Sequence, residues 1–350
     1  MSSLHNRGLS GGDASPGEEL RRRFSFPPGS NGGALAESAA MDVRAALKEG
    51  MAQLRTAGVA SHTPAAELLL MHALGRDRAW LYSHPETQID PAAAENYFGF
   101  VGRRAAGEPV QYITGKQEFW GLEFELTPAV LIPRPETEHV MEVALERLGA
   151  RGIKIRLDTG EPSAPLRIAD VGTGSGCLAV ALAWELSHAR VVATDISAEA
   201  LEVGRGNAAR HNVADRIEFM QCDLLSAFVE SPRTISAQPL VTSHSPLPFD
   251  LIVSNPPYVA RDEAETLQRE VRDHEPDAAL FGGPTGNEIY ARLIDQARSL
   301  LRSGGILVLE LGHNSAGHVR ELLASDPRWA NVTFTNDLAG IPRVIAAERV

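Results

Sequence analysis

The residues with the most distinctive chemistry in this sequence are Asn255, Pro256, Pro257 and Tyr258. They follow residues 249–254, an apolar run with β-branched members that predicts a buried parallel strand. Two consecutive prolines end the strand and prevent a helix from starting. The resulting turn offers bare carbonyl oxygens, an amide side chain and an aromatic ring at the end of a strand, where open α/β sheets bind ligands. The alternative is a strand-ending turn with a packing tyrosine.

A glycine-rich loop follows a second apolar run, at residues 166–171. Its glycines let the backbone approach a ligand closely and expose amides where a helix begins. Their spacing is GxGxG rather than the GxGxxG of dinucleotide sites, and an acid stands where a pyrophosphate would be repelled. That acid suits a cationic ligand instead. The residues are Asp170, Gly172, Thr173, Gly174, Ser175 and Gly176.

Acidic residues also follow the next two predicted strands. Asp195 ends the strand at 190–195 and can accept hydrogen bonds from both hydroxyls of a ribose. Asp223, followed by Leu224, comes after the strand at 216–221 and can accept from an adenine amino group. Each of these features is common by itself. In sheet order, an acid with a glycine loop, two further acids and the Asn-Pro-Pro-Tyr turn indicate one nucleoside-binding site.

Composition narrows the class of protein. The chain has 350 residues, with 43% hydrophobic and 22% charged residues, and its longest apolar runs fall short of a membrane span. A net charge of −12 disfavours extensive phosphate contact with nucleic acid. The 11 histidines and two cysteines lack metal-ligand spacing, so the sequence predicts no metal site, and a reducing cytoplasm is expected.

The chain divides into four parts. Residues 1–40 are rich in Ser, Gly and Pro and predict a disordered tail. Residues 41–108 carry amphipathic helical patterns and predict a small bundle, which is either a docking module or a structural lid. Within it, Thr63-Pro64 and Asp90-Pro91 predict helix starts, and Gly75 predicts a helix end. Residues 109–134 predict a β-hairpin linker around Gly121, and residues 135–350 the catalytic domain.

From residue 166 the pattern alternates between strands and helices, which predicts a doubly wound parallel sheet. The helices are expected at 176–187, 197–211 and 286–302. An antiparallel edge pair is expected at 332–335 and 343–347, and polar insertions at 151–165 and 231–248 are expected to be surface loops. The expected strands lie at 166–171, 190–195, 216–221, 249–254 and 305–311.

This arrangement resembles the class I S-adenosylmethionine-dependent methyltransferases, and the Asn-Pro-Pro-Tyr turn resembles that of enzymes that methylate a planar, conjugated NH2 group. Four further segments are similar to the protein-(glutamine-N5) methyltransferases that act on bacterial class-1 peptide release factors. The similarity runs from about residue 41 to the C-terminus. The segments are 131–138 (LIPRPETE), 270–276 (EVRDHEP), 282–286 (GGPTG) and 337–340 (DLAG).

The resemblance implies an α/β fold of the class I methyltransferase, Rossmann-like type, with a seven-stranded, mostly parallel sheet after the helical bundle and hairpin. It implies that Asn255, Pro256 and Tyr258 are catalytic and, with Pro257, bind a release-factor glutamine in a Gly-Gly-Gln motif. Leu224 stands where some members carry an aromatic residue. The implied S-adenosyl-L-methionine site comprises Asp170, Gly172, Thr173, Gly174, Ser175, Gly176, Asp195, Asp223, Leu224 and Asn255.

Other functions use similar elements. An adenine-N6 methyltransferase would use the same turn, but the acidic charge and short helical module argue against it. A sister group of glutamine methyltransferases modifies a ribosomal protein. An NAD-dependent oxidoreductase is disfavoured by the glycine spacing, and a non-catalytic interaction protein by the retention of all four site elements. No direct contact with nucleic acid or membrane is therefore expected.

Overall fold

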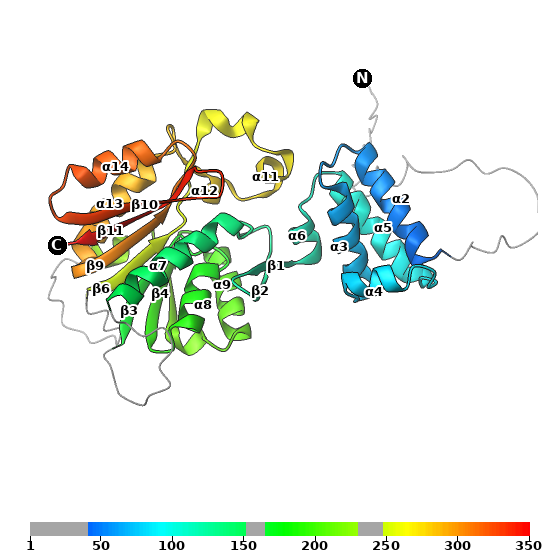
Figure 1. The fold of residues 1–350 in the computed structure, drawn as a ribbon, viewed down its shortest axis with the longest axis horizontal. Helices are drawn as coiled ribbons and strands as arrows, with labels where there is room; N and C mark the ends of the chain where they lie inside the picture. The colour runs from blue at the N-terminus through cyan, green and yellow to red at the C-terminus, as the bar shows by residue number, and fades with distance from the viewer. Residues whose placement is uncertain (1–40, 152–164, 230–247) are drawn as a thin grey trace, which may run out of the picture. The chain divides into compact units, whose positions relative to one another are not determined.

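The computed structural model describes residues 41–151, 165–229 and 248–350. The predicted tail at 1–40 lies outside these residues, as do almost all of the insertions predicted at 151–165 and 231–248. Within residues 41–350 the elements follow the predicted order of helices, hairpin and α/β domain (Figure 1).

The helical part is built from short amphipathic helices that share one apolar core, with Leu54, Leu69 and Tyr97 fully buried in it. Asp90 accepts hydrogen bonds from the amides of Ala92 and Ala93 and begins a helix, as its sequence predicts. The helices are α2 (Val43–Thr56), α3 (His62–Leu74), α4 (Arg78–Ser83), α5 (Pro91–Ala105) and α6 (Val110–Thr114).

One helix start differs from the sequence prediction. α3 begins at His62, with Ser61 at the cap position, so Thr63 and Pro64 lie in the first turn instead of forming its boundary. Proline is tolerated throughout the first turn because the amides there lack intrahelical partners. The other end agrees with the prediction, since Gly75 adopts a left-handed conformation with φ 62° and closes the helix.

The expected hairpin is formed by β1 (Lys116–Phe119) and β2 (Leu122–Glu125), which pair antiparallel. Trp120 and Gly121 make the turn with φ angles of 56° and 71°. The residues before it, which the sequence suggested as part of the hairpin, instead complete α6.

The central sheet has seven strands in the order β10-β11-β9-β6-β3-β4-β5. Strands β3, β4, β5, β6 and β9 are parallel. At one edge β11 pairs antiparallel with β9 and β10 pairs antiparallel with β11, so β11 alone runs against the other strands of this sheet, and the predicted sheet with its antiparallel edge pair is confirmed. The strands are β3 (Leu166–Val171), β4 (Ala189–Asp195), β5 (Ile217–Gln221), β6 (Phe249–Ser254), β9 (Leu301–Glu310), β10 (Trp329–Asn336) and β11 (Pro342–Arg349).

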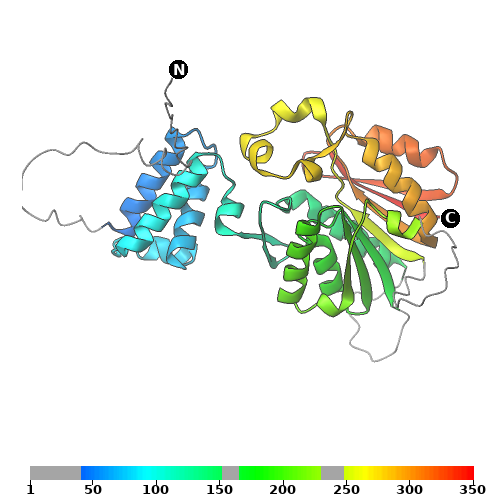
Figure 2. The ribbon, with the colours of Figure 1, turned by 180° about the vertical axis from the view of Figure 1, so that it is seen from behind.

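Helices cover both faces of this sheet (Figures 1 and 2). A short parallel pair, β7 (Val259–Ala260) and β8 (Phe281–Gly283), stands apart from it. The long helices are α7 (Glu138–Ala150), α8 (Cys177–Glu185), α9 (Ala198–Arg210), α13 (Glu288–Leu300) and α14 (Ala316–Ala324). The short ones are η1 (Pro135–Thr137), η2 (Ala214–Arg216), α10 (Ser226–Val229), η3 (Arg261–Thr266), α11 (Arg269–His274) and α12 (Asp277–Leu280).

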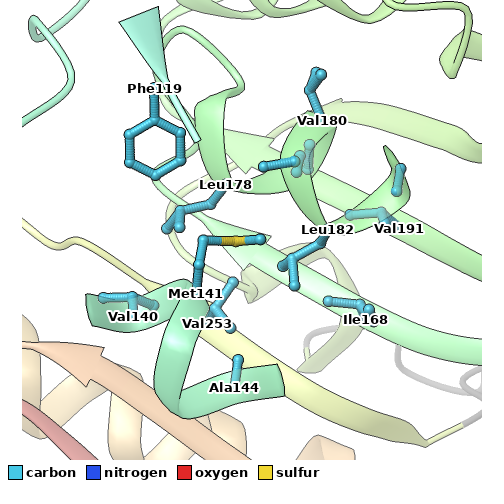
Figure 3. Packing of buried hydrophobic residues seen from close by; sticks show 14 of the residues in the cluster. Phe119, Val140, Met141, Ala144, Ile168, Leu178, Val180, Leu182, Val191 and Val253 are labelled. Atoms are coloured by element: carbon cyan, nitrogen blue, oxygen red, sulfur yellow. The ribbon is translucent and has the colours of Figure 1, made fainter. Parts of the chain in front are cut away.

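Alternating residues of each strand supply two separate cores. Ile168 and Val253 pack with Met141 of α7 and with α8 on one face (Figure 3). Ala169 and Ile252 pack with α13 and α14 on the other. The strands therefore read as continuous apolar runs, because both faces are buried.

The carboxyl ends of the parallel strands meet at one edge of the sheet. β3 pairs with β4 on one side and with β6 on the other, so the chain order reverses beside β3, which is where such sheets bind ligands. At this point Val171 is opposite Ser254, and the Ser254 hydroxyl donates to the Val171 carbonyl over 2.6 Å. The glycine loop and the Asn-Pro-Pro-Tyr turn therefore start side by side.

Asn207 of α9 ties the hairpin to the glycine loop. Its side chain is fully buried and exchanges hydrogen bonds of 2.8 and 3.0 Å with the backbone of Glu125 in β2. The same amide donates to the Ser175 carbonyl over 2.9 Å. Each of these backbone groups would be left unpaired without it, which is costly in a dry interior.

We expect Asn207→Ala to lower the free energy of unfolding by roughly 2–4 kcal/mol, because buried backbone donors and acceptors lose their partners. Urea unfolding measures this. Asn96→Ala is the matched control, since Asn96 is exposed on α5 and its loss should change stability by less than about 0.5 kcal/mol. Equal changes in the free energy of unfolding for the two substitutions would show that the Asn207 side chain does not stabilise the contact between the hairpin and the glycine loop.

Candidate active site

The glycine loop between β3 and α8 has a left-handed backbone conformation at each of its three glycines. Gly172, Gly174 and Gly176 have φ angles of 71°, 54° and 79°, which favour glycine. A side-chain carbon at Gly172 or Gly174 would meet open space, whereas one at Gly176 would lie 3.2 Å from the Cα of Gly204. The first two glycines thus leave room for a ligand, and the third permits close packing of α8 on α9.

Asp170, in the strand that precedes this loop, stabilises the loop through hydrogen bonds. Its side chain is buried and accepts hydrogen bonds from the Thr173 hydroxyl, over 2.6 Å, and from the Ala179 amide, over 3.0 Å. Burial raises the pKa of Asp170 to about 7, although these two hydrogen bonds oppose the rise. The sequence suggested that Asp170 faces a cationic ligand. In the structure its Oδ2 supports the loop and the start of α8, whereas its Oδ1 is buried and has no hydrogen-bond partner among the described residues.

Asp195 lies at the end of β4, beside the loop. One carboxylate oxygen accepts from the Gly174 amide and the other from the Ser197 amide, each over 2.9 Å. A carboxylate oxygen can accept more than one hydrogen bond, so both retain capacity for ligand hydroxyls. Asp223 forms an ion pair with Arg292, and its neighbour Leu224 has a φ of 52°, a strained conformation for a branched residue.

These elements surround a cavity of about 470 Å³, which is within the usual size of small-molecule sites. Of the expected cofactor residues, Asp170, Thr173, Ser175 and Gly176 stand outside its lining. The sequence reasoning missed most of the apolar wall, although Ile196, directly after Asp195, was a readable signal. The lining comprises Gly172, Gly174, Asp195, Asp223, Leu224, Asn255 and Pro257 together with Ala129, Val130, Leu131, Ile196, Ser197, Glu199, Ala200, Cys222, Pro276, Ala278, Ala279, Phe281, Ile289 and Arg292.

The Asn-Pro-Pro-Tyr turn is fixed by side chains from other elements. The Asn255 amide donates to the Thr137 hydroxyl over 3.0 Å, and the Tyr258 hydroxyl donates to a Glu310 carboxylate oxygen over 3.2 Å. Burial, and then the nearby charge of Glu310, raise the pKa of Tyr258, which keeps its hydroxyl protonated as a donor.

Glycines from two other segments press against the same turn. A side-chain carbon at Gly282 would lie 2.5 Å from the Pro257 carbonyl oxygen, and one at Gly286 would lie 2.3 Å from that of Tyr258. A side-chain carbon at Gly312 would lie 2.9 Å from the Tyr258 ring. The backbone of the turn is therefore packed directly against backbone on one side.

A second cavity, of about 610 Å³, lies beyond Tyr258. Arg134 and Glu275, from two segments far apart in the sequence, form an ion pair of 2.5 Å in its wall, with Glu275 buried. Glu310 and Arg343 also line it. Because Asn255 lines the first cavity and Tyr258 the second, the turn separates two spaces that could each hold one reactant.

Comparisons with known proteins agree with this geometry. Residues 45–115 match a family model described as the PrmC N-terminal domain, and residues 163–338 match one described as a methyltransferase domain. A release factor glutamine methyltransferase of Koribacter versatilis is 41% identical over 88% of this chain and 99% of its own. The chain belongs to the release factor glutamine methyltransferase family.

Two other members of the release factor glutamine methyltransferase family are similarly related. That of Chlorobaculum tepidum is 45% identical over 79% of this chain and 87% of its own. That of Bradyrhizobium diazoefficiens is 40% identical over 85% of this chain and 92% of its own.

Among the described residues, helices are too short or too polar to cross a bilayer.

We expect Gly286→Ala to lower the methyl-transfer rate by about tenfold or more, because the added carbon displaces the Tyr258 backbone from its aligned position. Steady-state kinetics measure the methyl-transfer rate, and calorimetric titration separately measures the affinity for the cofactor. The control is Gly206→Ala, on an exposed turn of α9 where the added carbon meets open space. Turnover equal to wild type in Gly286→Ala would show that the turn tolerates movement.

Proposed function

We propose that the protein transfers a methyl group from S-adenosyl-L-methionine to the side-chain amide nitrogen (N5) of the glutamine in the Gly-Gly-Gln motif of class-1 peptide release factors. The observation that carries this is the Asn-Pro-Pro-Tyr turn between two cavities, in a chain of the release factor glutamine methyltransferase family. The reaction takes place in the cytoplasm, in keeping with two cysteines that are both free thiols.

The first cavity fits the proposed cofactor. Gly172 and Gly174 leave open space where side chains would otherwise stand, and the Asp195 carboxylate lies beside them. Asp195 would bind the ribose hydroxyls, and Asp223 with Leu224 would border the adenine. When bound, the sulfonium supplies an electrophilic methyl group and departs as a neutral thioether, while the acceptor nitrogen gains the methyl and loses one proton to solvent.

The turn would align the acceptor. An amide nitrogen is a weak nucleophile because its lone pair is delocalised into the carbonyl group. The Asn255 side-chain oxygen and the Pro256 carbonyl can accept hydrogen bonds from the acceptor NH2, and the Tyr258 ring can pack against the amide plane. None of these groups needs to act as a strong base, because the amide proton becomes acidic as the new bond forms.

The second cavity and the helical part would serve the protein substrate. Tyr258 faces this cavity, so it is where the acceptor glutamine would enter. A Gly-Gly-Gln segment brings little side-chain bulk, which suits a narrow approach, but offers little surface for specificity. We therefore assign residues 41–108 to docking of the release factor.

The product tests the function directly. Intact release factor incubated with the protein and S-adenosylmethionine should gain about 14 Da, one CH2, on its Gly-Gly-Gln glutamine, as mapped by mass spectrometry. A release factor with glutamate in that position is the control. A free Gly-Gly-Gln peptide should react more slowly, because it cannot engage the helical part. Methylation of adenine or of a ribosomal protein in place of the release factor would overturn the assignment.

Asn255→Ala should lower kcat by about 10²-fold or more while leaving most of the cofactor affinity, since a preorganised contact to the acceptor is lost. Asn255→Asp should be about as slow. Its carboxylate keeps the size but cannot donate to the Thr137 hydroxyl as the Asn255 amide does. Kinetics with Glu321→Ala, exposed on α14, as the control measure this. An Asp variant much faster than the Ala variant would show that the donated hydrogen bond is dispensable.

Asp195→Ala should weaken S-adenosylmethionine binding by roughly 1–3 kcal/mol, because it removes the acceptor for the ribose hydroxyls. Asp195→Asn keeps one acceptor oxygen and should lose less. Isothermal calorimetry on the full chain measures both, with Glu202→Gln, exposed on α9 and outside the cavity lining, as the control. Unchanged affinity in the Ala variant would remove Asp195 from the site.

A further inference from the structure

Glu310, the last residue of β9, is a buried carboxyl group beside the turn. It was not among the site residues that the sequence pointed to. One carboxylate oxygen accepts from the Thr137 hydroxyl over 2.6 Å, and the other accepts from the Tyr258 hydroxyl over 3.2 Å. Thr137 in turn lies 3.0 Å from the Asn255 side-chain amide. A continuous chain of hydrogen bonds thus joins Glu310 to both polar side chains of the turn.

Which group donates in each of these hydrogen bonds follows from the chemistry of the side chains. An ionised carboxylate can only accept, so the single O–H of Thr137 must point to Glu310. Toward Asn255 the Thr137 oxygen can then only accept, which requires Asn255 to present its NH2 group. The Asn255 oxygen is thereby left for other partners. This orientation is the one that an acceptor NH2 needs, because two NH2 groups cannot hydrogen-bond to each other.

We propose that Glu310 is a positioning residue for methyl transfer, which acts through Thr137 to keep the Asn255 carboxamide oxygen facing the acceptor amide and through Tyr258 to fix the aromatic ring. The proposal rests on the proposed function, in which a glutamine NH2 is the acceptor. Although Glu310 lines the second cavity, in this scheme it acts through Thr137 and Tyr258 and makes no contact with the reacting atoms. Its effect is to select one of the two orientations of a side chain whose ends are nearly equal in shape.

The protonation state of Glu310 decides whether the direction is enforced. Burial raises the pKa of Glu310 to about 7, against the opposing effect of the hydrogen bonds from Thr137 and Tyr258. A protonated Glu310 can donate to Thr137, which frees the Thr137 hydroxyl to donate to Asn255 and lets the Asn255 amide reverse. The charged and titratable groups facing Glu310 from the elements packed around it are Glu136, Cys177, Tyr258, Tyr290 and Arg343.

Four variants distinguish a role in orienting Asn255 from a role in stabilising the fold. Thr137→Val keeps the shape but removes the hydroxyl, and should lower kcat by about tenfold or more with little change in KM or cofactor affinity. Thr137→Ser restores the hydroxyl and should recover most of kcat. Glu310→Gln should remove the fall in kcat that the wild type shows as pH decreases through about 7. Glu321→Gln, an exposed change of the same kind on α14, should retain that fall.

A second readout needs no substrate. In nitrogen-15 spectra of the full chain, the Asn255 side-chain NH2 signals can be assigned by their loss in Asn255→Asp. We expect them to shift in Thr137→Val, to return in Thr137→Ser, and to titrate near pH 7 in the wild type but not in Glu310→Gln. Wild-type kcat in Thr137→Val, or an NH2 signal that ignores Thr137, would overturn the proposal.

The two readouts distinguish the possible failures. If the wild type leaves release-factor glutamine unmodified while the Asn255 signals follow Thr137 and Glu310, the acceptor assignment is wrong and the orientation of Asn255 stands. If the glutamine is methylated but the signals and kcat are indifferent to both residues, the function stands and the positioning role of Glu310 is wrong.

Discussion

The parallel pairing of β3 with β6 is the constraint on which the site depends. Val171 and Ser254 are opposite each other, and the Ser254 hydroxyl joins the two strand ends. The glycine loop and the Asn-Pro-Pro-Tyr turn follow directly, so their separation is set by the spacing of neighbouring strands rather than by loop conformation. Sites built on strand ends in this way inherit the rigidity of the sheet.

The second cavity explains why segments far apart in the sequence carry the family resemblance. Arg134 comes from the segment before α7, Glu275 from the segment after α11, and Arg343 from β11. Asp337, in the turn before β11, accepts from Arg343 over 2.9 Å and holds it at that wall. Segments with no pattern in common therefore converge on one surface, which the alternation of strands and helices does not reveal.

Much of the fold could be predicted from sequence, because strands buried on both faces leave continuous apolar runs. β3 and β6 have the predicted bounds, and the edge pair β10 and β11 is antiparallel as expected. Residue roles were harder to predict. An acid before a glycine loop can face the ligand or support the loop, and the spacing does not indicate that one oxygen of Asp170 supports the loop.

Other parts of the site depend on tertiary contacts that leave little trace in local sequence. Thr137 reads as part of a helix start, yet it contacts both Asn255 and Glu310. Gly282 and Gly286 read as a turn, yet they allow close backbone packing against the Asn-Pro-Pro-Tyr segment. Glu310 did leave a signal, since an acid at the end of an apolar run predicted to be buried needs a partner.

The buried carboxyl groups at this edge of the sheet set stability against activity. Burial raises the pKa of both Asp170 and Glu310 to about 7, well above the values of exposed carboxyl groups. In the range between, the folded chain binds more protons than the unfolded chain, so the stability gained from protonation at low pH is lost as pH rises through about 7. The fold is thus less stable with Glu310 ionised than with Glu310 protonated, although the ionised form is the one that orders Asn255. The ordered turn therefore comes with a lower free energy of unfolding.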